Sequence, residues 1–358
     1  MESLERLDMD LDFYRGKRIL ITGHTGFKGS WMCRLLLEVG ADLTGYSLTP
    51  PTEPALFTIL GLQKKMRSII GDIRDFQNLQ AVFIQTQPEI VFHLAAQPIV
   101  RESYKSPRDT YETNVMGTVN LLECVRASSS VRSVVNVTTD KVYLNREWIW
   151  GYREDEMLDG YDPYSNSKSC SELVTRSYVR SFFQGKSALA ISTVRSGNVI
   201  GGGDFACDRI IPDCIRAVLS GKEIIVRNPS SIRPYQHVLE PVVVYLMIAE
   251  RQYSDSSFSD CYNVGPDDCD CVTTGELVDM FATLWGNGAR WLNVSEPNGP
   301  HEASFLKLDC SKLKHRFGWR PKWRITEAVK RTCEWVKVWR SGGDLDHEMH
   351  RQISEFLN

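Results

Sequence analysis

The chain of 358 residues carries 42 Lys and Arg against 45 Asp and Glu, for a formal net charge of −3 and a sequence pI near 6.2. Without an excess of positive charge or a block of Lys and Arg, the sequence argues against binding to nucleic acid. The length is sufficient for one large domain or two interlocked domains with an extensive core.

Membrane and metal signals are equally weak. Residues 1–6 contain no apolar segment of a secretory signal, and apolar runs such as 242–249 fall short of the ~18 residues of a membrane span. We therefore expect a soluble, cytoplasmic protein that does not bind membranes. Its ten cysteines include no Cys-x-x-Cys pair, so we expect reduced structural thiols and no metal site.

The first predicted strand, residues 17–22, leads directly into a glycine-rich loop. A helix to residue 37 and a second strand over 42–48 follow within about thirty residues, the order of a dinucleotide-binding unit. The glycines permit a tight turn and close backbone approach, and a helix N-terminus offers N–H groups to a pyrophosphate. A simple strand-to-helix turn is the alternative, but it does not need three glycines. The predicted cofactor loop is Gly23, His24, Thr25, Gly26, Phe27, Lys28 and Gly29.

The second strand ends in Tyr46 and Ser47, where an Asp or Glu usually contacts the adenosine ribose. No arginine follows that would bind a 2′-phosphate. The sequence therefore favours NAD over NADP.

Further strands are predicted over 67–70, 89–94, 133–137 and 188–194. The last three are nearly continuous apolar runs, which are typical of parallel strands covered on both faces. We therefore predict an α/β fold, a doubly wound parallel sheet (Rossmann fold) with a smaller, interleaved mixed α/β lobe. Ligands of such sheets lie at the carboxyl ends of the strands. Further cofactor candidates are therefore Asp72, Ile73, Leu94, Ala95, Ala96, Gln97 and Thr138, with Asn114 on a helix predicted over 111–125.

Candidate catalytic residues cluster between positions 138 and 168. Thr139, Asp140 and Lys141 end a predicted strand, and Tyr164 precedes Lys168 by four residues, one helical turn. A neighbouring cation stabilises a phenolate, so Lys168 is expected to lower the pKa of Tyr164 from its usual ~10. Such a Tyr-x-x-x-Lys pair occurs readily by chance, and its weight comes from the glycine loop and strands around it.

After residue 199 the pattern changes to loops rich in Gly, Pro and Arg, which we interpret as a substrate-binding lobe. Arg209, Arg227 and Arg233 favour an anionic ligand, since guanidinium groups bind phosphate in bidentate fashion. Surface solvation is the alternative for Arg209 and Arg227. We expect an NAD-binding domain over 1–196, with an interleaved segment near 235–262, and a mainly nucleotide-sugar-binding lobe over 197–358.

The glycine loop, Asp72, Asn114, Thr139, Tyr164 and Lys168 occur in this order, and with them the whole chain resembles the extended short-chain dehydrogenases/reductases acting on nucleotide sugars. The 4,6-dehydratases of this group carry Thr-Asp-Glu where this sequence has Thr139-Asp140-Lys141. The resemblance implies a hydro-lyase that uses NAD and acts on CDP-glucose. The implied product, CDP-4-dehydro-6-deoxyglucose, would serve dideoxyhexose synthesis for the O-antigen of lipopolysaccharide.

The resemblance also implies roles for individual residues. Tyr164 would take the proton of sugar O4, and Lys168 would bind the nicotinamide ribose. Asp140 would protonate the departing O6, with capping of a helix as the alternative. Lys141 would remove the C5 proton, stabilise the enolate as a charged group, or only bridge Asp140. The substrate-binding candidates are Asn198 and Arg233 at the diphosphate, Arg209, Ile211 and Pro212 toward the cytosine, and Arg227 and His301.

Two other functions remain open on sequence grounds. A nucleotide-sugar 4-epimerase of the same fold would need no acid at Asp140, and a catalytically silent NAD-sensing protein would not need the pair Tyr164 and Lys168. The family also implies a homodimer or homotetramer, assembled through the helices that begin near Tyr111 and Tyr164.

Overall fold

The computed structural model describes residues 9–185, 189–294 and 303–358. Its centre is a seven-stranded sheet in the order β11-β6-β5-β4-β1-β2-β3, and every neighbouring pair is parallel. The strands are β1 (Arg18–Thr22), β2 (Asp42–Ser47), β3 (Arg67–Ile70), β4 (Ile90–His93), β5 (Ser133–Thr139), β6 (Ala190–Ser196) and β11 (Cys261–Val264). The predicted doubly wound parallel sheet is confirmed.

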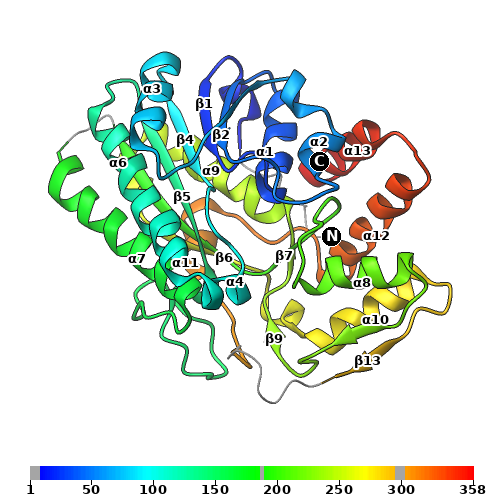
Figure 1. Ribbon diagram of the computed structural model, residues 1–358. Helices are drawn as coiled ribbons and strands as arrows, with labels where there is room; N and C mark the ends of the chain where they lie inside the picture. Colours follow the sequence, from blue (N-terminus) through cyan, green and yellow to red (C-terminus); the bar gives the residue numbers. More distant parts are fainter. Residues whose placement is uncertain (1–8, 186–188, 295–302) are drawn as a thin grey trace.

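Successive strand residues belong alternately to two hydrophobic cores, one on each face of the sheet. Ile19 and Ile21 of β1 belong to the larger core, which contains α1 (Phe27–Glu38) and α9 (Leu239–Ser254). Leu20 between them points to the smaller core, with α3 (Phe76–Thr86) and α6 (Gly117–Ala127). This alternation follows from the period of two along a strand, and Figure 1 shows helices on both sides of the strands.

Two predicted elements differ from the structure in ways that affect the site. The helix expected over 111–125 is divided into α5 (Pro107–Tyr111), a π-helical turn (Glu112–Met116) and α6. The strand expected over 133–137 continues to Thr139, so Thr138 and Thr139 are held in extended backbone at the carboxyl end of β5. Helix α7 (Pro163–Tyr178) follows and carries Tyr164 and Lys168.

The smaller lobe lies beside the carboxyl ends of the strands, at the lower right of Figure 1. It contains α8 (Ile210–Leu219), α10 (Thr274–Trp285), the parallel pair β8 (Ile224–Val226) and β13 (Trp291–Asn293), and the antiparallel pair β9 (Ile232–Arg233) and β12 (Val272–Thr273). The remaining elements are α2 (Leu56–Ile59), α4 (Val100–Lys105), β7 (Val199–Ile200), β10 (Gln236–His237), α11 (Ser311–Phe317), α12 (Ile325–Arg340) and α13 (Leu345–Leu357).

The chain passes between the two parts more than once. It leaves the sheet after β6, builds α8, β8 and β9 in the lobe, and returns through α9 to β11 at the sheet edge. The division into domains at residues 196 and 197 stays a prediction. Among the described helices, none combines the length and the apolar character that crossing a membrane requires.

Candidate active site

A cavity of about 330 Å³ opens between the carboxyl ends of the strands and the lobe. It brings together residues that are far apart in the sequence and that were predicted as catalytic, cofactor-binding or substrate-binding. From the sheet side these are Lys28, Thr138, Thr139, Lys141 and Tyr164, and from the lobe side Asn198, Arg209, Ile211, Pro212, Arg227 and Arg233.

The glycine loop after β1 forms a backbone cradle. Gly23 has φ +76°, and a Cβ there would lie 2.7 Å from the amide nitrogen of Ala95. A Cβ on Gly29 would lie 2.3 Å from the carbonyl oxygen of Gly23. Gly26 provides no side-chain cap for α1, so the first N–H groups of the helix are available to a ligand. This cradle fits the pyrophosphate of a dinucleotide.

His24, predicted to bind the cofactor, directs its side chain into the protein interior. The imidazole is fully buried; Nε2 lies 2.7 Å from the hydroxyl oxygen of Ser68 and Nδ1 lies 3.1 Å from that of Ser47. A Cβ on Gly45 would lie only 2.2 Å from the ring, so this glycine makes the space for it. Burial lowers the pKa of His24 to about 4, so the ring is neutral at pH 7. The imidazole therefore belongs to the packing beneath the loop.

The polar residues at the end of β2 contact the loops that follow β1 and β3. Thr25 Oγ1 lies 2.8 Å from the hydroxyl oxygen of Ser47, and the Tyr46 hydroxyl donates to the carbonyl of Asp72 at 2.8 Å. The Asp72 carboxylate accepts hydrogen bonds from Arg74, which lower its pKa. The Asp72 carboxylate is therefore already paired.

Asn114 links two other predicted cofactor segments. Its side chain accepts from the Gln97 amide at 2.8 Å and donates to the Gln97 carbonyl at 3.1 Å and to the Ser167 hydroxyl at 2.9 Å. Asn114 is buried. The structure therefore shows it fixing the loop after β4 against α7.

Tyr164 lies at the first turn of α7, almost fully buried, and forms a hydrogen bond with Thr139. Burial raises the pKa of Tyr164 to about 12, although the Thr139 hydrogen bond and the positive charge of Arg209 oppose this. Lys168 donates to the carbonyl of Val137 at 3.3 Å, and burial lowers its pKa to about 8. The expectation that Lys168 lowers the pKa of Tyr164 is wrong here, because burial raises this pKa and the cation that opposes the rise is Arg209.

Asp140 and Lys141 form a contact pair at the end of β5. Lys141 Nζ lies 2.9 Å from Asp140 Oδ1 and also donates to Asn198 Oδ1 at 3.1 Å. Asp140 is fully buried, and its Oδ1 also accepts from Thr139 at 2.9 Å. Its Oδ2 has no hydrogen-bond partner within the described parts of the chain. The pair thus combines a buried carboxyl group, one of whose oxygens has no hydrogen-bond partner among the described residues, with an amine at the cavity wall.

The side chain of Lys28 was predicted only as part of the loop, and its position was missed. Its Nζ donates to the Ser196 hydroxyl at 3.0 Å and lies 3.5 Å from the Tyr245 hydroxyl. Burial, followed by the positive charges of Arg209 and Lys168, lowers the pKa of Lys28 to about 7. The signal that could have found this position is the lysine inside the glycine motif. A lysine at that place is close to the site, and buried lysines are uncommon.

The lobe arginines line the cavity but also have partners. Arg209 pairs with Asp204 at 2.9 Å, and Arg227 pairs with Asp208 at 3.1 Å. Arg233, mostly buried, donates to the carbonyls of Ile232 and Ala303. Surface solvation therefore does not account for Arg233, whereas Arg209 and Arg227 remain partly exposed beside their partners. His301 lies outside the described residues.

Comparisons with known proteins connect this geometry to a family. The model of the GDP-mannose 4,6 dehydratase family matches residues 20–332. A CDP-glucose 4,6-dehydratase from Salmonella typhimurium strain LT2 is 51% identical over 355 residues, covering 98% of this chain and 99% of that protein.

Two solved structures extend the comparison. The dTDP-glucose 4,6-dehydratase DesIV from Streptomyces venezuelae, a double mutant with NAD and DAU bound, has a TM-score of 0.76 and 25% identity over 91% of this chain and 98% of that one. A UDP-glucose 4-epimerase from Thermotoga maritima, solved with UDP-glucose, has a TM-score of 0.79 and 23% identity over 90% of this chain and 99% of that one. The second likeness concerns the fold alone.

Proposed function

Because the chain belongs to the GDP-mannose 4,6-dehydratase family, we propose that it catalyses the NAD-dependent dehydration of CDP-glucose to CDP-4-dehydro-6-deoxyglucose. The observation that carries this proposal is the near full-length similarity to the Salmonella enzyme of that activity. The reaction oxidises sugar C4, eliminates water across C5 and C6, and reduces C6. It is therefore a hydro-lyase reaction.

The cradle formed by the glycine loop fits NAD, with Gly23 and Gly29 leaving the space that a Cβ would fill. When bound, NAD supplies the acceptor for the hydride from C4 and returns that hydride to C6. The predicted contacts of residues 23–29, 72–73, 94–97, 114 and 138 with the cofactor remain part of this proposal.

In the oxidation step, Tyr164 takes the proton of the sugar O4 hydroxyl. Its hydrogen bond with Thr139 places the phenol oxygen beside a second hydroxyl that can hold the same substrate oxygen. Burial keeps the phenol protonated, and the Thr139 hydrogen bond and the positive charge of Arg209 oppose this. We assign the further stabilisation of the phenolate to Lys168, one helical turn away on α7.

In the elimination step, Lys141 removes the C5 proton and Asp140 protonates the departing O6. The 2.9 Å contact between Lys141 Nζ and Asp140 Oδ1 holds the two residues together. The step requires Lys141 as a neutral amine and Asp140 as a carboxylic acid with its proton on Oδ2, the oxygen that lacks a partner within the described residues. From Oδ2 the proton passes to O6 as the C5 proton passes to Lys141.

We expect Lys141→Ala to retain C4 oxidation but to lose water elimination by about 10²–10⁴-fold, the usual contribution of a positioned base. Rapid mixing with CDP-glucose would then show reduced cofactor accumulating without product. Lys141→Arg is the matched control, because a guanidinium keeps the positive charge but does not act as a base. Normal elimination by the arginine variant would assign Lys141 to charge stabilisation, and normal elimination by the alanine variant would remove it from the mechanism.

The overall reaction is tested by mass spectrometry of CDP-glucose incubated with the protein and NAD in heavy water. We expect a product that lacks one water and carries one solvent deuterium at C5, because the C5 proton is exchanged with solvent. An unchanged mass would contradict the proposal and would favour the 4-epimerase or the silent NAD-binding protein.

We further propose a cytoplasmic homodimer or homotetramer whose product serves dideoxyhexose synthesis for O-antigen. Exposed apolar side chains on the helical segments that follow Tyr111 and Tyr164 support the assembly: Met116 before α6, Leu173 in α7 and Phe182 in the turn that follows α7 are 50%, 48% and 46% exposed.

A further inference from the structure

Three side chains on successive turns of α7 face the end of β5. Tyr164, Lys168 and Glu172 are spaced by four residues and therefore share one side of the helix. Tyr164 contacts Thr139, and Lys168 donates to the carbonyl of Val137. Glu172 accepts a hydrogen bond of 2.5 Å from the Thr138 hydroxyl, on the residue between the other two contacts. Glu172 has no assigned role in the steps of the proposed reaction.

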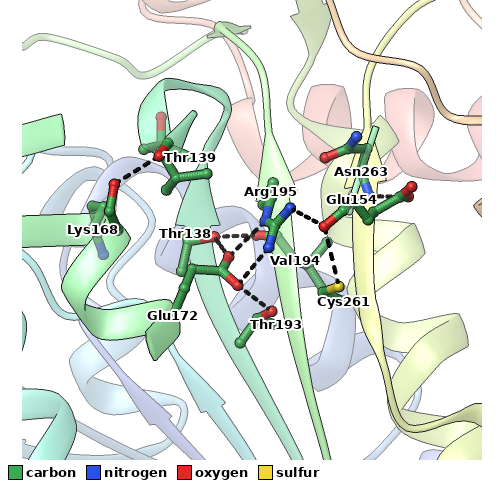
Figure 2. Close-up of polar contacts among 12 residues, drawn as sticks. Thr138, Thr139, Glu154, Lys168, Glu172, Thr193, Val194, Arg195, Cys261 and Asn263 are labelled. Carbon is green, nitrogen blue, oxygen red and sulfur yellow. Dashed lines mark hydrogen bonds and ion pairs between the residues drawn. The ribbon is translucent and has the colours of Figure 1, made fainter. Parts of the chain in front are cut away.

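The Glu172 carboxylate is buried and saturated with donors (Figure 2). Besides Thr138, its oxygens accept from the Thr193 hydroxyl at 2.7 Å and from Arg195 Nε and Nη2, each at 3.0 Å. The Arg195 side chain is itself fully buried. This geometry ties α7 to both β5 and β6 directly behind the catalytic residues.

Arg195 extends the network toward the substrate side. Its Nη1 donates to the Tyr143 hydroxyl at 2.7 Å and to the Glu154 carbonyl at 3.1 Å. Tyr143 lines the cavity, and its hydroxyl donates to Asn263 of β11 at 2.6 Å. A continuous set of buried hydrogen bonds therefore runs from the catalytic helix to the cavity wall.

We propose that Glu172 is a positioning residue of this active site. Its carboxylate fixes α7 against the end of β5 and supplies the negative charge that keeps Lys168 an ammonium group. The proposal rests on the proposed function for its kinetic part only, because the position and charge of Lys168 can be measured without substrate.

The surroundings of Lys168 make Glu172 the significant counter-charge. The charged and titratable groups around Lys168 include Tyr164 and Glu172 on α7, His93 on β4, Lys28 on α1, Asp140 and Lys141 after β5, and Arg195 on β6, which pairs with Glu172. Burial lowers the pKa of His93 on β4 and of Lys28 on α1, and the positive charge of Lys168 lowers both further. Asp140 forms its ion pair with Lys141, and Glu172 forms one with Arg195. Burial lowers the pKa of Lys168 to about 8, and the negative charge of Glu172 opposes this.

The kinetic test is the pH dependence of kcat in Glu172→Gln. Without the carboxylate, Lys168 loses its proton at a lower pH, so the alkaline limb of the profile is expected to move down by about one pH unit or more. We expect kcat at neutral pH to fall at least about tenfold, because the positioned proton transfer is weakened. The KM for CDP-glucose is expected to change little, since Glu172 is not part of the cavity wall.

Two further variants separate positioning from folding. Glu240→Gln is the matched control, because Glu240 is another buried glutamate, which accepts hydrogen bonds from the backbone amides of Lys322 and Trp323. This substitution is expected to leave the pH profile unchanged. Because Glu172→Gln leaves Arg195 as an unpaired buried cation, Glu172→Gln with Arg195→Met keeps the region neutral and foldable. An alkaline limb that stays in place in this folded double variant would overturn the proposal.

A substrate-free measurement distinguishes failure of the inference from failure of the proposed function. The folded-state pKa of Lys168, about 8, lies below its unfolded value. The unfolded chain therefore binds more protons above pH 8, and Lys168 makes the free energy of unfolding rise with pH from there to ~10.4. The free energy of unfolding is measured with urea across this pH range for the protein and for Lys168→Met. The difference between the two isolates the rise that is due to Lys168. We expect it to begin at lower pH in the double variant, and an unchanged onset would contradict the inference even if CDP-glucose is not the substrate.

Discussion

Replacing Tyr164 with phenylalanine is expected to reduce kcat by about 10²–10⁴-fold while the KM for CDP-glucose changes little. The substitution removes only the hydroxyl that takes the O4 proton and contacts Thr139, and the ring remains to fill the buried space. Reduced cofactor should no longer form in a single turnover, because the hydride leaves C4 only as O4 loses its proton.

The effect of Tyr164→Phe can be compared with Tyr178→Phe on the same helix. Tyr178 donates to Glu123 at 2.8 Å and lies three to four turns from the cavity end of α7, so its loss should leave kcat unchanged. Rapid formation of reduced cofactor by Tyr164→Phe would mean that another group is the base for the first step.

Asp140→Asn is expected to divide the reaction between its first and second steps. The amide oxygen of asparagine can still accept from Thr139 and Lys141, so the local structure is retained. It cannot carry the proton that O6 needs or exchange one with Lys141. We expect C4 oxidation near the normal rate, and water loss slower by about 10²–10⁴-fold.

The measurement for Asp140→Asn is rapid quenching with mass spectrometry, which should find the unreduced 4-keto hexose still carrying its O6. Asp75→Asn provides the control, because Asp75 caps the N-terminus of α3 and asparagine caps equally well. Water loss at the normal rate in Asp140→Asn would assign protonation of O6 to a different group.

Much of this site could be predicted from the sequence because local patterns determine it. The loop from Gly23 to Gly29 needs glycines because a Cβ at Gly23 or Gly29 would overlap backbone atoms, and the glycine spacing in the sequence indicates such a loop. The spacing of Tyr164 and Lys168 follows from one turn of helix, and the apolar runs identify β4, β5 and β6 as buried parallel strands.

The rest depends on contacts between distant segments, and no local pattern encodes those contacts. His24 lies in the glycine loop, yet its ring packs under Gly45 of the neighbouring strand. Lys28 reaches Ser196, 168 residues away, and Glu172 pairs with Arg195 across two elements. The pKa of Tyr164 was mispredicted for the same reason, because burial depends on the whole fold and not on the adjacent lysine.

The late return of the chain to the sheet has a consequence for synthesis on the ribosome. Strand β6 ends at Ser196, but its outer neighbour β11 begins only at Cys261, after residues 197–260. Until those residues have been translated, the nascent chain presents β6 as an open edge whose residues are all buried in the finished protein. An open edge strand is a template for intermolecular pairing. Protection of this edge during translation thus becomes a requirement for producing the protein in soluble form.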